Sequence, residues 1–145
     1  MFGGFSKGLN IKSLAFATVA VFVFFFGTDF LVHGILLKDC YLKTASLWRS
    51  QAEMDKYGWW MVLSHLLIAK FFTLLFAKGY EGKGIPEGLR FGFLIGCYAV
   101  GGVVMQYVVT PIPRSIFAAW VATTIVQSIL GGVVASLVYK KKSRN

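Results

Sequence analysis

Four long stretches of the chain are almost wholly apolar, and short polar segments separate them. They cover residues 13–37, 58–77, 89–109 and 115–139. A helix needs about 20 mostly apolar residues to cross the roughly 30 Å hydrocarbon core of a bilayer, because it rises about 1.5 Å per residue. The pattern therefore predicts an all-α polytopic membrane protein. We expect one membrane domain over residues 1–145, a four-helix transmembrane bundle.

The first connection, residues 38–57, is the longest and mixes aromatic with charged residues. Within it, Ala45, Trp48 and Ala52 fall on one side at helical spacing. This spacing favours a short amphipathic helix lying at the membrane interface. A solvated connector is the alternative interpretation.

The other two connections are shorter. Residues 78–88 are rich in glycine, and they end in Pro86 and Glu87. Both residue types suit the first turn of the next helix, where a missing N–H costs nothing and a carboxylate meets the positive end of the helix dipole. Residues 110–114 (TPIPR) predict a sharp turn, since proline cannot continue a helix.

The composition agrees with a membrane location. The chain is 57% apolar and only 14% charged, and its net charge is +9. An ordinary soluble domain is roughly 45–50% apolar and about 25% charged. Because so few residues are charged, we expect the basic residues to meet the lipid bilayer and not a nucleic acid. Two cysteines exclude a disulfide framework.

The basic residues outside the spans are divided unevenly between the two sides. Four spans place both termini on one side. That side receives Lys7, Lys12, Lys78, Lys83, Arg90, Lys140, Lys141, Lys142 and Arg144. The opposite side receives Lys38, Lys43, Arg49, Lys56 and Arg114. The positive-inside rule therefore predicts that both termini are cytoplasmic.

Four ionisable residues lie inside the first two spans, namely Asp29, His33, His65 and Lys70. Inserting a charged side chain costs about 2.5–3.5 kcal/mol on translocon scales, so each is a candidate functional residue. Asp29 and His33 are four residues apart and share a helical face. The helical rise places Asp29 and His65 at similar depths, about 10–12 Å from the side opposite the termini. We expect Asp29 to pair with His65 or Lys70.

Milder polar residues in the same half of the bundle are Gln106, Thr123, Thr124 and Gln127. All of these residues together form either a polar clasp that fixes helix packing or a site or pathway for a proton, an ion or a small solute. A third interpretation is a haem or metal held by His33 and His65. No ligand spacing identifies a metal, and no other cofactor is predicted.

No catalytic residue is predicted. The sequence contains neither GxSxG nor HExxH, and Ser64 beside His65 points in another direction on a helix. The glycines of residues 78–88 follow no strand and precede no GK[ST], so they do not indicate a phosphate-binding loop. A role other than catalysis is favoured.

Small residues recur at four-residue spacing in the last two spans. Gly92 and Gly96 form a GxxxG pair, and Gly131 and Gly132 each have a small residue four positions away. Such spacing lets helix backbones approach closely. The simplest use is packing of the third span on the fourth. A homodimer contact or a docking face for a larger partner is the alternative.

Three segments resemble a group of small bacterial four-span membrane proteins of unknown function. They are DFLVHGILLKDCY…LWR, FAKGYEGKGIPEGLRFG and TPIPRSIFAAW. The layout also resembles a broader bacterial domain family of unknown function, with an aromatic-rich first loop and an EG-L-x-x-G start of the third span. The resemblance covers nearly the whole chain. It implies a helical bundle of the bacterial cytoplasmic (inner) membrane and brings no activity.

These observations favour a small integral membrane protein that is not an enzyme and that acts by helix association, as an oligomer or an accessory subunit of a larger membrane complex. The alternative is an oligomeric transporter or channel for protons, ions or a small solute, using the cluster of Asp29, His33, His65 and Lys70. A haem- or quinone-associated redox subunit is the third hypothesis.

Overall fold

The computed structural model describes residues 8–141, which form helices and no strands. Four of the helices are long and apolar enough to cross a membrane. They are α1 (Ile11–Asp29), α4 (Gly58–Lys78), α5 (Ile85–Val109) and α6 (Arg114–Val138). The predicted four-helix architecture is therefore confirmed, and the chain is a small integral membrane protein.

Helix α1 does not stop at its last α-helical residue. It continues into a π-helix, Phe30–Leu36, and the first apolar span accordingly covers Ile11–Leu36. The wider turn is visible in the backbone bond from the N–H of Leu37 to the carbonyl of Val32, five residues earlier. Segments of π-helix occur frequently at functional sites, and this one contains His33.

Helix α5 begins at Ile85, before the apolar span predicted from residue 89, because residues 85–88 form its first turn. Gly84 precedes it with a φ of 68°, a left-handed conformation that favours glycine. The buried carboxylate of Glu87 accepts backbone N–H groups from Glu81 at 2.7 Å and Lys83 at 2.8 Å. The expected place of Pro86 and Glu87 in the first turn is confirmed.

The first loop is helical, but in three short pieces instead of one helix. These are α2 (Lys38–Lys43), a 3₁₀ turn (Ala45–Leu47) and α3 (Gln51–Lys56). The break comes at Trp48, whose backbone is extended, and Ser50 then caps α3 in a capping box with Glu53. The expected single face of Ala45, Trp48 and Ala52 is therefore divided between segments.

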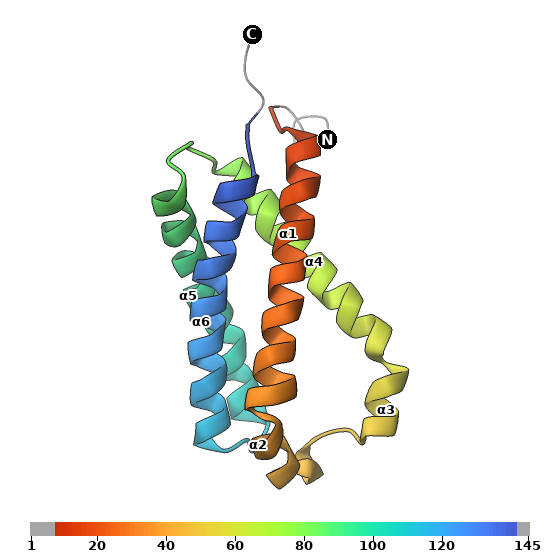
Figure 1. The fold of residues 1–145 in the computed structure, drawn as a ribbon. Helices are drawn as coiled ribbons and strands as arrows, with labels where there is room; N and C mark the ends of the chain where they lie inside the picture. Colours follow the sequence, from red (N-terminus) through yellow and green to blue (C-terminus); the bar gives the residue numbers. More distant parts are fainter. Residues whose placement is uncertain (1–7, 142–145) are drawn as a thin grey trace.

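Three contacts between long helices organise the bundle (Figure 1). Helices α5 and α6 lie side by side along their length, and α1 packs against both α6 and α4. The start of α1 and the end of α6 meet, because Ser13 Oγ donates to the carbonyl of Val138 at 3.3 Å and accepts the N–H of Lys140 at 2.6 Å. We call this the terminal end, and the opposite end, which carries α2 and α3, the loop end.

The contact between α5 and α6 is built on glycine. A Cβ on Gly92 would collide with the backbone of Ser128, and one on Gly132 with the backbone of Gly88. A Cβ on Gly96 would lie 3.2 Å from the Cα of Ile125. The predicted use of Gly92, Gly96 and Gly132 in packing α5 on α6 is thus seen directly, and Gly88 extends the same ridge by one turn.

Three other glycines lie outside the contact between α5 and α6. A Cβ on Gly131 would collide with the ring of Phe25, so this glycine makes room for α1 and not for α5. Gly101 and Gly102 have open space around the position of a Cβ and lie on the exposed face of α5.

The terminal-end half of the bundle is filled by aromatic rings. Phe72 of α4 lies edge-on to Phe25 and Phe91, with ring centroids 5.2 and 5.0 Å apart, and Phe76 lies 5.3 Å from Phe91. Val21 beside them is fully buried. These contacts join α1, α4 and α5 into a dense core.

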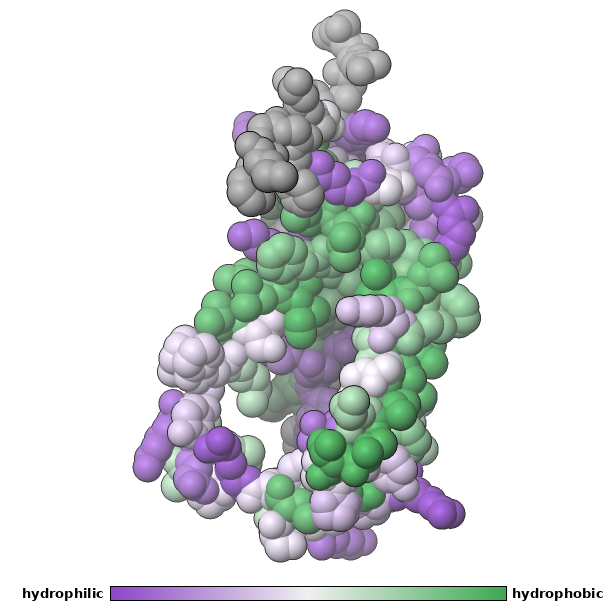
Figure 2. Space-filling model, turned by 180° about the vertical axis from the view of Figure 1, so that it is seen from behind, coloured by the Kyte–Doolittle hydropathy of each residue, from purple (hydrophilic) through white to green (hydrophobic). Residues whose placement is uncertain are grey.

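The loop-end half is packed less closely, because α4 leaves the bundle there. Figure 1 shows α4 running obliquely past α1 and then away from the other helices toward α3. Trp59, Trp60 and Met61 at this end of α4 are each more than half exposed. Seen from behind, hydrophilic side chains lie deep in a hollow bordered by apolar surfaces (Figure 2). The candidate site lies in this half.

Candidate polar site in the loop-end half

Asp29, the last residue of α1 before the π-helix, joins three helices. Its Oδ2 lies 2.7 Å from Nε2 of His65 on α4. Its Oδ1 accepts Nε2–H of Gln127 on α6 at 2.8 Å. The same amide nitrogen also lies 2.6 Å from Oγ1 of Thr28. Sequence reasoning placed Asp29 and His65 at one depth, and the structure brings them into contact.

The hydrogen bonds of His65 fix the proton content of the Asp29–His65 pair. Its Nδ1 lies 2.7 Å from the carbonyl oxygen of Met61. A carbonyl oxygen only accepts, so Nδ1 carries a hydrogen. One further hydrogen lies between Nε2 and the Asp29 carboxyl. Whichever atom holds that hydrogen, the pair has no net charge.

A neutral pair is well suited to this depth. An isolated carboxylate in an apolar layer would lose its hydration without compensation, whereas a paired and hydrogen-bonded group avoids most of that cost. The side chain of His65 is only 13% exposed and that of Asp29 is 31% exposed. Asp29 is therefore partly accessible from the hollow beside it.

His33 belongs to a second hydrogen-bonded group, nearer the loop end. Its Nδ1 lies 2.6 Å from the hydroxyl of Tyr41, and Nε1–H of Trp120 donates to the same hydroxyl at 2.7 Å. The indole only donates, so the Tyr41 oxygen accepts from Trp120, and we expect the Tyr41 O–H to donate to Nδ1 of His33. His33 then keeps its own hydrogen on Nε2.

Burial and the surrounding groups set the acidity of this tyrosine. Desolvation raises the pKa of Tyr41 above its ordinary value of 10.0, and the hydrogen bond from Trp120 opposes that rise. The Trp48 ring packs against both, with centroids 5.4 Å from Tyr41 and 6.0 Å from Trp120. These aromatic side chains pack together at the loop end of the site.

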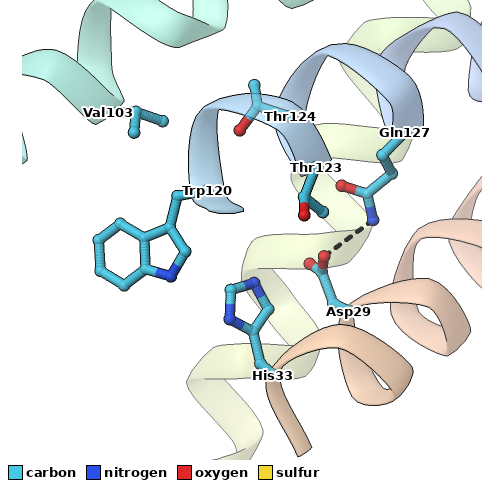
Figure 3. Close-up of a pocket in the computed structure, with 7 residues that line it drawn as sticks. All are labelled: Asp29, His33, Val103, Trp120, Thr123, Thr124 and Gln127. Atoms are coloured by element: carbon cyan, nitrogen blue, oxygen red, sulfur yellow. Dashed lines mark hydrogen bonds between the residues drawn. The ribbon is translucent and has the colours of Figure 1, made fainter. Parts of the chain in front are cut away.

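A recess of about 300 Å³ lies between the two hydrogen-bonded groups. It is lined by Asp29, His33, Val103, Trp120, Thr123, Thr124 and Gln127. Figure 3 shows the His33 ring and the Asp29 carboxyl directed toward Thr123 across this space, with Val103 and Trp120 at its far side. Residues from α1, α5 and α6 thus surround one polar space inside the apolar layer.

The two threonines in the recess differ from the other helical threonines of the chain. Thr18, Thr28 and Thr73 each donate a hydrogen bond to the carbonyl four residues earlier, at 2.8 Å. Thr123 and Thr124 make no such bond, and among residues 8–141 their hydroxyls have no partner. These hydroxyls remain free to bond with a molecule in the recess.

Two predicted members of the polar cluster lie elsewhere. Lys70 is exposed on α4, with its Nζ 6.0 Å from the centre of the Phe71 ring. The neighbouring Ala69 is fully buried, so the helix turns Lys70 away from α1. Gln106 is also exposed, and its amide donates to Thr110 at 2.7 Å. Gln127, and not Lys70, contacts Asp29.

The hydrogen bonds of His65 compete with the alternative that His33 and His65 hold a haem or a metal. Both ring nitrogens of His65 are engaged, one by Met61 and one by Asp29. Ligation by His65 would therefore break one of these bonds. Within the described part of the chain, no three His, Cys, Asp or Glu side chains are grouped to hold a metal ion.

Sequence reasoning missed Tyr41, Trp120 and Thr28 as parts of the site. Thr28 is adjacent to Asp29 and was detectable from its position. Tyr41 and Trp120 are 79 residues apart, and both resemble ordinary interfacial aromatic residues in sequence. Only the fold brings their polar atoms to His33.

No protein-family model matches the chain, and no curated protein or solved structure is significantly similar to it. The resemblance to small four-span bacterial proteins stays a prediction, and the site is interpreted from its own geometry.

Proposed function

We propose that the protein is a non-catalytic subunit of the bacterial cytoplasmic membrane, and that its recess binds the polar part of a small molecule. The observation that carries this proposal is the pair of free hydroxyls, Thr123 and Thr124, inside a recess of about 300 Å³. Ligand sites are typically about 300–1,000 Å³ and combine an apolar wall with a few polar groups. Unpaired polar groups at this depth are costly, so water or a ligand satisfies them.

Binding is a better account of the geometry than conduction by one chain. The aromatic core of Phe25, Phe72, Phe76 and Phe91 fills the terminal-end half, and none of these rings lines the recess. A transport path would have to form between chains or require movement of this core. The proton held between Asp29 and His65 favours transport as the second candidate function, because chains of Asp and His serve as proton relays in membranes.

Helix association is the wider role in which this binding takes place. The α5–α6 ridge is used within the chain, so a partner would meet other apolar faces. The exposed face of α5 with Gly101 and Gly102 allows close approach of another helix. We propose that the subunit forms an oligomer or joins a larger membrane complex through such faces.

The experiment is a survey of co-purifying molecules. The protein is extracted with its native lipids into polymer-bounded discs, and bound small molecules are identified by mass spectrometry. Wild type is compared with the double variant Thr123→Val/Thr124→Val, and Gln106→Leu serves as a polar-to-apolar control outside the recess. We expect a molecule retained by wild type and by the control and lost from the double variant. The same molecules in all three samples would contradict the proposal.

A further inference from the structure

The chemistry of the recess indicates what kind of molecule it takes, and this inference rests on the proposed function. We propose that the recess binds the head of an uncharged, lipid-soluble carbonyl compound of the quinone type, which enters from the plane of the membrane between α4 and α5. Three features of the site lead to this conclusion: its charge, its hydrogen-bond donors and its open side.

The recess offers no net charge to a ligand. Asp29 is its only acidic lining residue, and its charge is balanced by the hydrogen shared with His65. Lys70, the nearest basic residue in the spans, lies on the lipid-facing surface of α4. A charged head group entering the recess would therefore lose its hydration without meeting an opposite charge.

The free groups of the recess include hydrogen-bond donors that a ligand can use. Thr123 and Thr124 each present a hydroxyl, which can donate or accept, and His33 offers Nε2–H in the tautomer whose Nδ1 accepts from Tyr41. Gln127 contributes a free amide oxygen, since its nitrogen is held by Asp29 and Thr28. Carbonyl oxygens can only accept. A ligand head with carbonyl oxygens can accept from these donors, whereas an ammonium group has no acceptor to offer them.

Access is from the side. Packed aromatic side chains lie on both sides of the recess: Tyr41, Trp48 and Trp120 toward the loop end, and Phe25 and its neighbours toward the terminal end. The open side lies where α4 leaves the bundle, and Figure 2 shows apolar surfaces bordering the hollow there. A molecule that reaches this opening is dissolved in the lipid, and its apolar tail stays among the acyl chains.

The volume and the lining residues of the recess indicate the size and shape of the head group that it can bind. A volume of about 300 Å³ is at the small end for ligand sites, which suits a single ring. The indole of Trp120 and the imidazole of His33 line the same space, with ring centroids 6.3 Å apart. A flat ring with carbonyl oxygens can contact these aromatic walls and reach the donors at its edge.

The test uses decyl-benzoquinone as the probe in lipid nanodiscs, read by quenching of tryptophan fluorescence. Trp120 is kept as the single tryptophan by Trp48→Phe/Trp59→Phe/Trp60→Phe. A second variant keeps only Trp59, which lies exposed on α4 and reports partitioning into lipid. We expect saturable quenching of Trp120 and non-saturable quenching of Trp59. In the Trp120 background, Thr123→Val/Thr124→Val should weaken binding about tenfold or more, and Thr123→Ser/Thr124→Ser should restore it.

Competition with charged amphiphiles separates the inference from the proposed function. Decyltrimethylammonium and decyl sulfate have the same chain length and should not displace the quinone below the concentrations at which they perturb the disc. If either binds saturably and depends on the two threonines, the recess is a binding site but the carbonyl class is wrong. If Trp120 is quenched only as Trp59 is, the inference is overturned, whereas the co-purification survey still decides the proposed function.

Discussion

Asp29 and His65 lie 2.7 Å apart, from Oδ2 to Nε2, and hold a single hydrogen between α1 and α4. Gln127 binds the other oxygen of Asp29 from α6. The Asp29 carboxyl group therefore connects three helices and also lines the recess. The clasp and binding-site interpretations of the sequence are not exclusive, because the same residue serves both.

Substituting Asp29 separates these roles. Asn at position 29 can accept from Gln127 and donate to Nε2 of a neutral His65, so Asp29→Asn should keep the clasp and lose only the exchangeable proton. Asp29→Leu removes both interhelical bonds, each worth about 0.6 kcal/mol on average and up to about 1.7 kcal/mol. We expect a loss of about 1–3 kcal/mol for Leu and less than about 1 kcal/mol for Asn, measured by unfolding in mixed micelles. Equal losses would mean that the hydrogen bonds to Asp29 do not stabilise the fold.

The glycine ridge gives a second prediction. Gly132→Ala places a methyl group against the backbone of Gly88, and such overpacking costs about 1–3 kcal/mol. Gly101→Ala is the matched control, because its Cβ meets open space and alanine favours a helix by up to about 1 kcal/mol. Thermal unfolding in detergent should show a lower midpoint for Gly132→Ala and an equal or higher one for Gly101→Ala. A reversed order would show that α5 and α6 do not pack as described.

Removing the Tyr41 hydroxyl should loosen the first loop. Tyr41→Phe leaves Nε1–H of Trp120 and Nδ1 of His33 without their partner, and an unsatisfied buried polar group costs about 1–3 kcal/mol. We expect faster amide hydrogen exchange over residues 38–47 and unchanged exchange in the α5–α6 contact. Unchanged exchange in the loop would mean that Tyr41 does not hold it to α6.

The same tyrosine gives a dependence on pH. Burial raises the pKa of Tyr41 above 10.0 in the folded chain, so the folded state keeps this proton at pH values where the unfolded state releases it. The stabilisation is therefore complete below about pH 10 and is lost as the pH rises toward the folded-state pKa. The phenolate absorbance of wild type minus that of Tyr41→Phe should show one group titrating above 10. A midpoint at or below 10 would contradict the burial of this hydroxyl.

The proposed orientation is tested by labelling. In a Cys40→Ser/Cys97→Ser background, Lys56→Cys at the loop end should react with a membrane-impermeant maleimide on intact bacterial spheroplasts. Lys141→Cys at the terminal end should react only after permeabilisation. Both positions are exposed, so access depends on sidedness. The opposite pattern would place the recess on the cytoplasmic side and contradict the predicted cytoplasmic termini.

Much of the fold followed from the sequence because the membrane imposes simple rules. Apolar length located the four helices, and small-residue spacing identified Gly92, Gly96 and Gly132 as packing positions. Helical rise gave the depth that Asp29 shares with His65. These inferences depend on local spacing and on a single axis, the membrane normal.

The rest depends on rotation and on distant contacts. Depth alone did not show that Ala69, and not Lys70, faces α1. The pairing of Gln127 with Asp29 and the meeting of Tyr41 with Trp120 depend on how α6 is turned. The π-helix at Phe30–Leu36 and the departure of α4 from the bundle leave no clear sequence signal, although together they shape the recess.

The two histidines differ in which ring nitrogen always carries a hydrogen. In His65 this nitrogen is Nδ1, which leaves Nε2 to share a hydrogen with Asp29, and in His33 it is Nε2, which donates into the recess. The chain has only two histidines, so ¹⁵N-histidine labelling in nanodiscs gives two rings, assigned with His33→Gln. We predict that the His65 ring carries a hydrogen on Nδ1 and shares another from Nε2 with Asp29. We predict that the His33 ring carries a hydrogen on Nε2 and accepts at Nδ1. An unprotonated Nδ1 in His65, or a protonated Nδ1 with an unprotonated Nε2 in His33, would contradict the account.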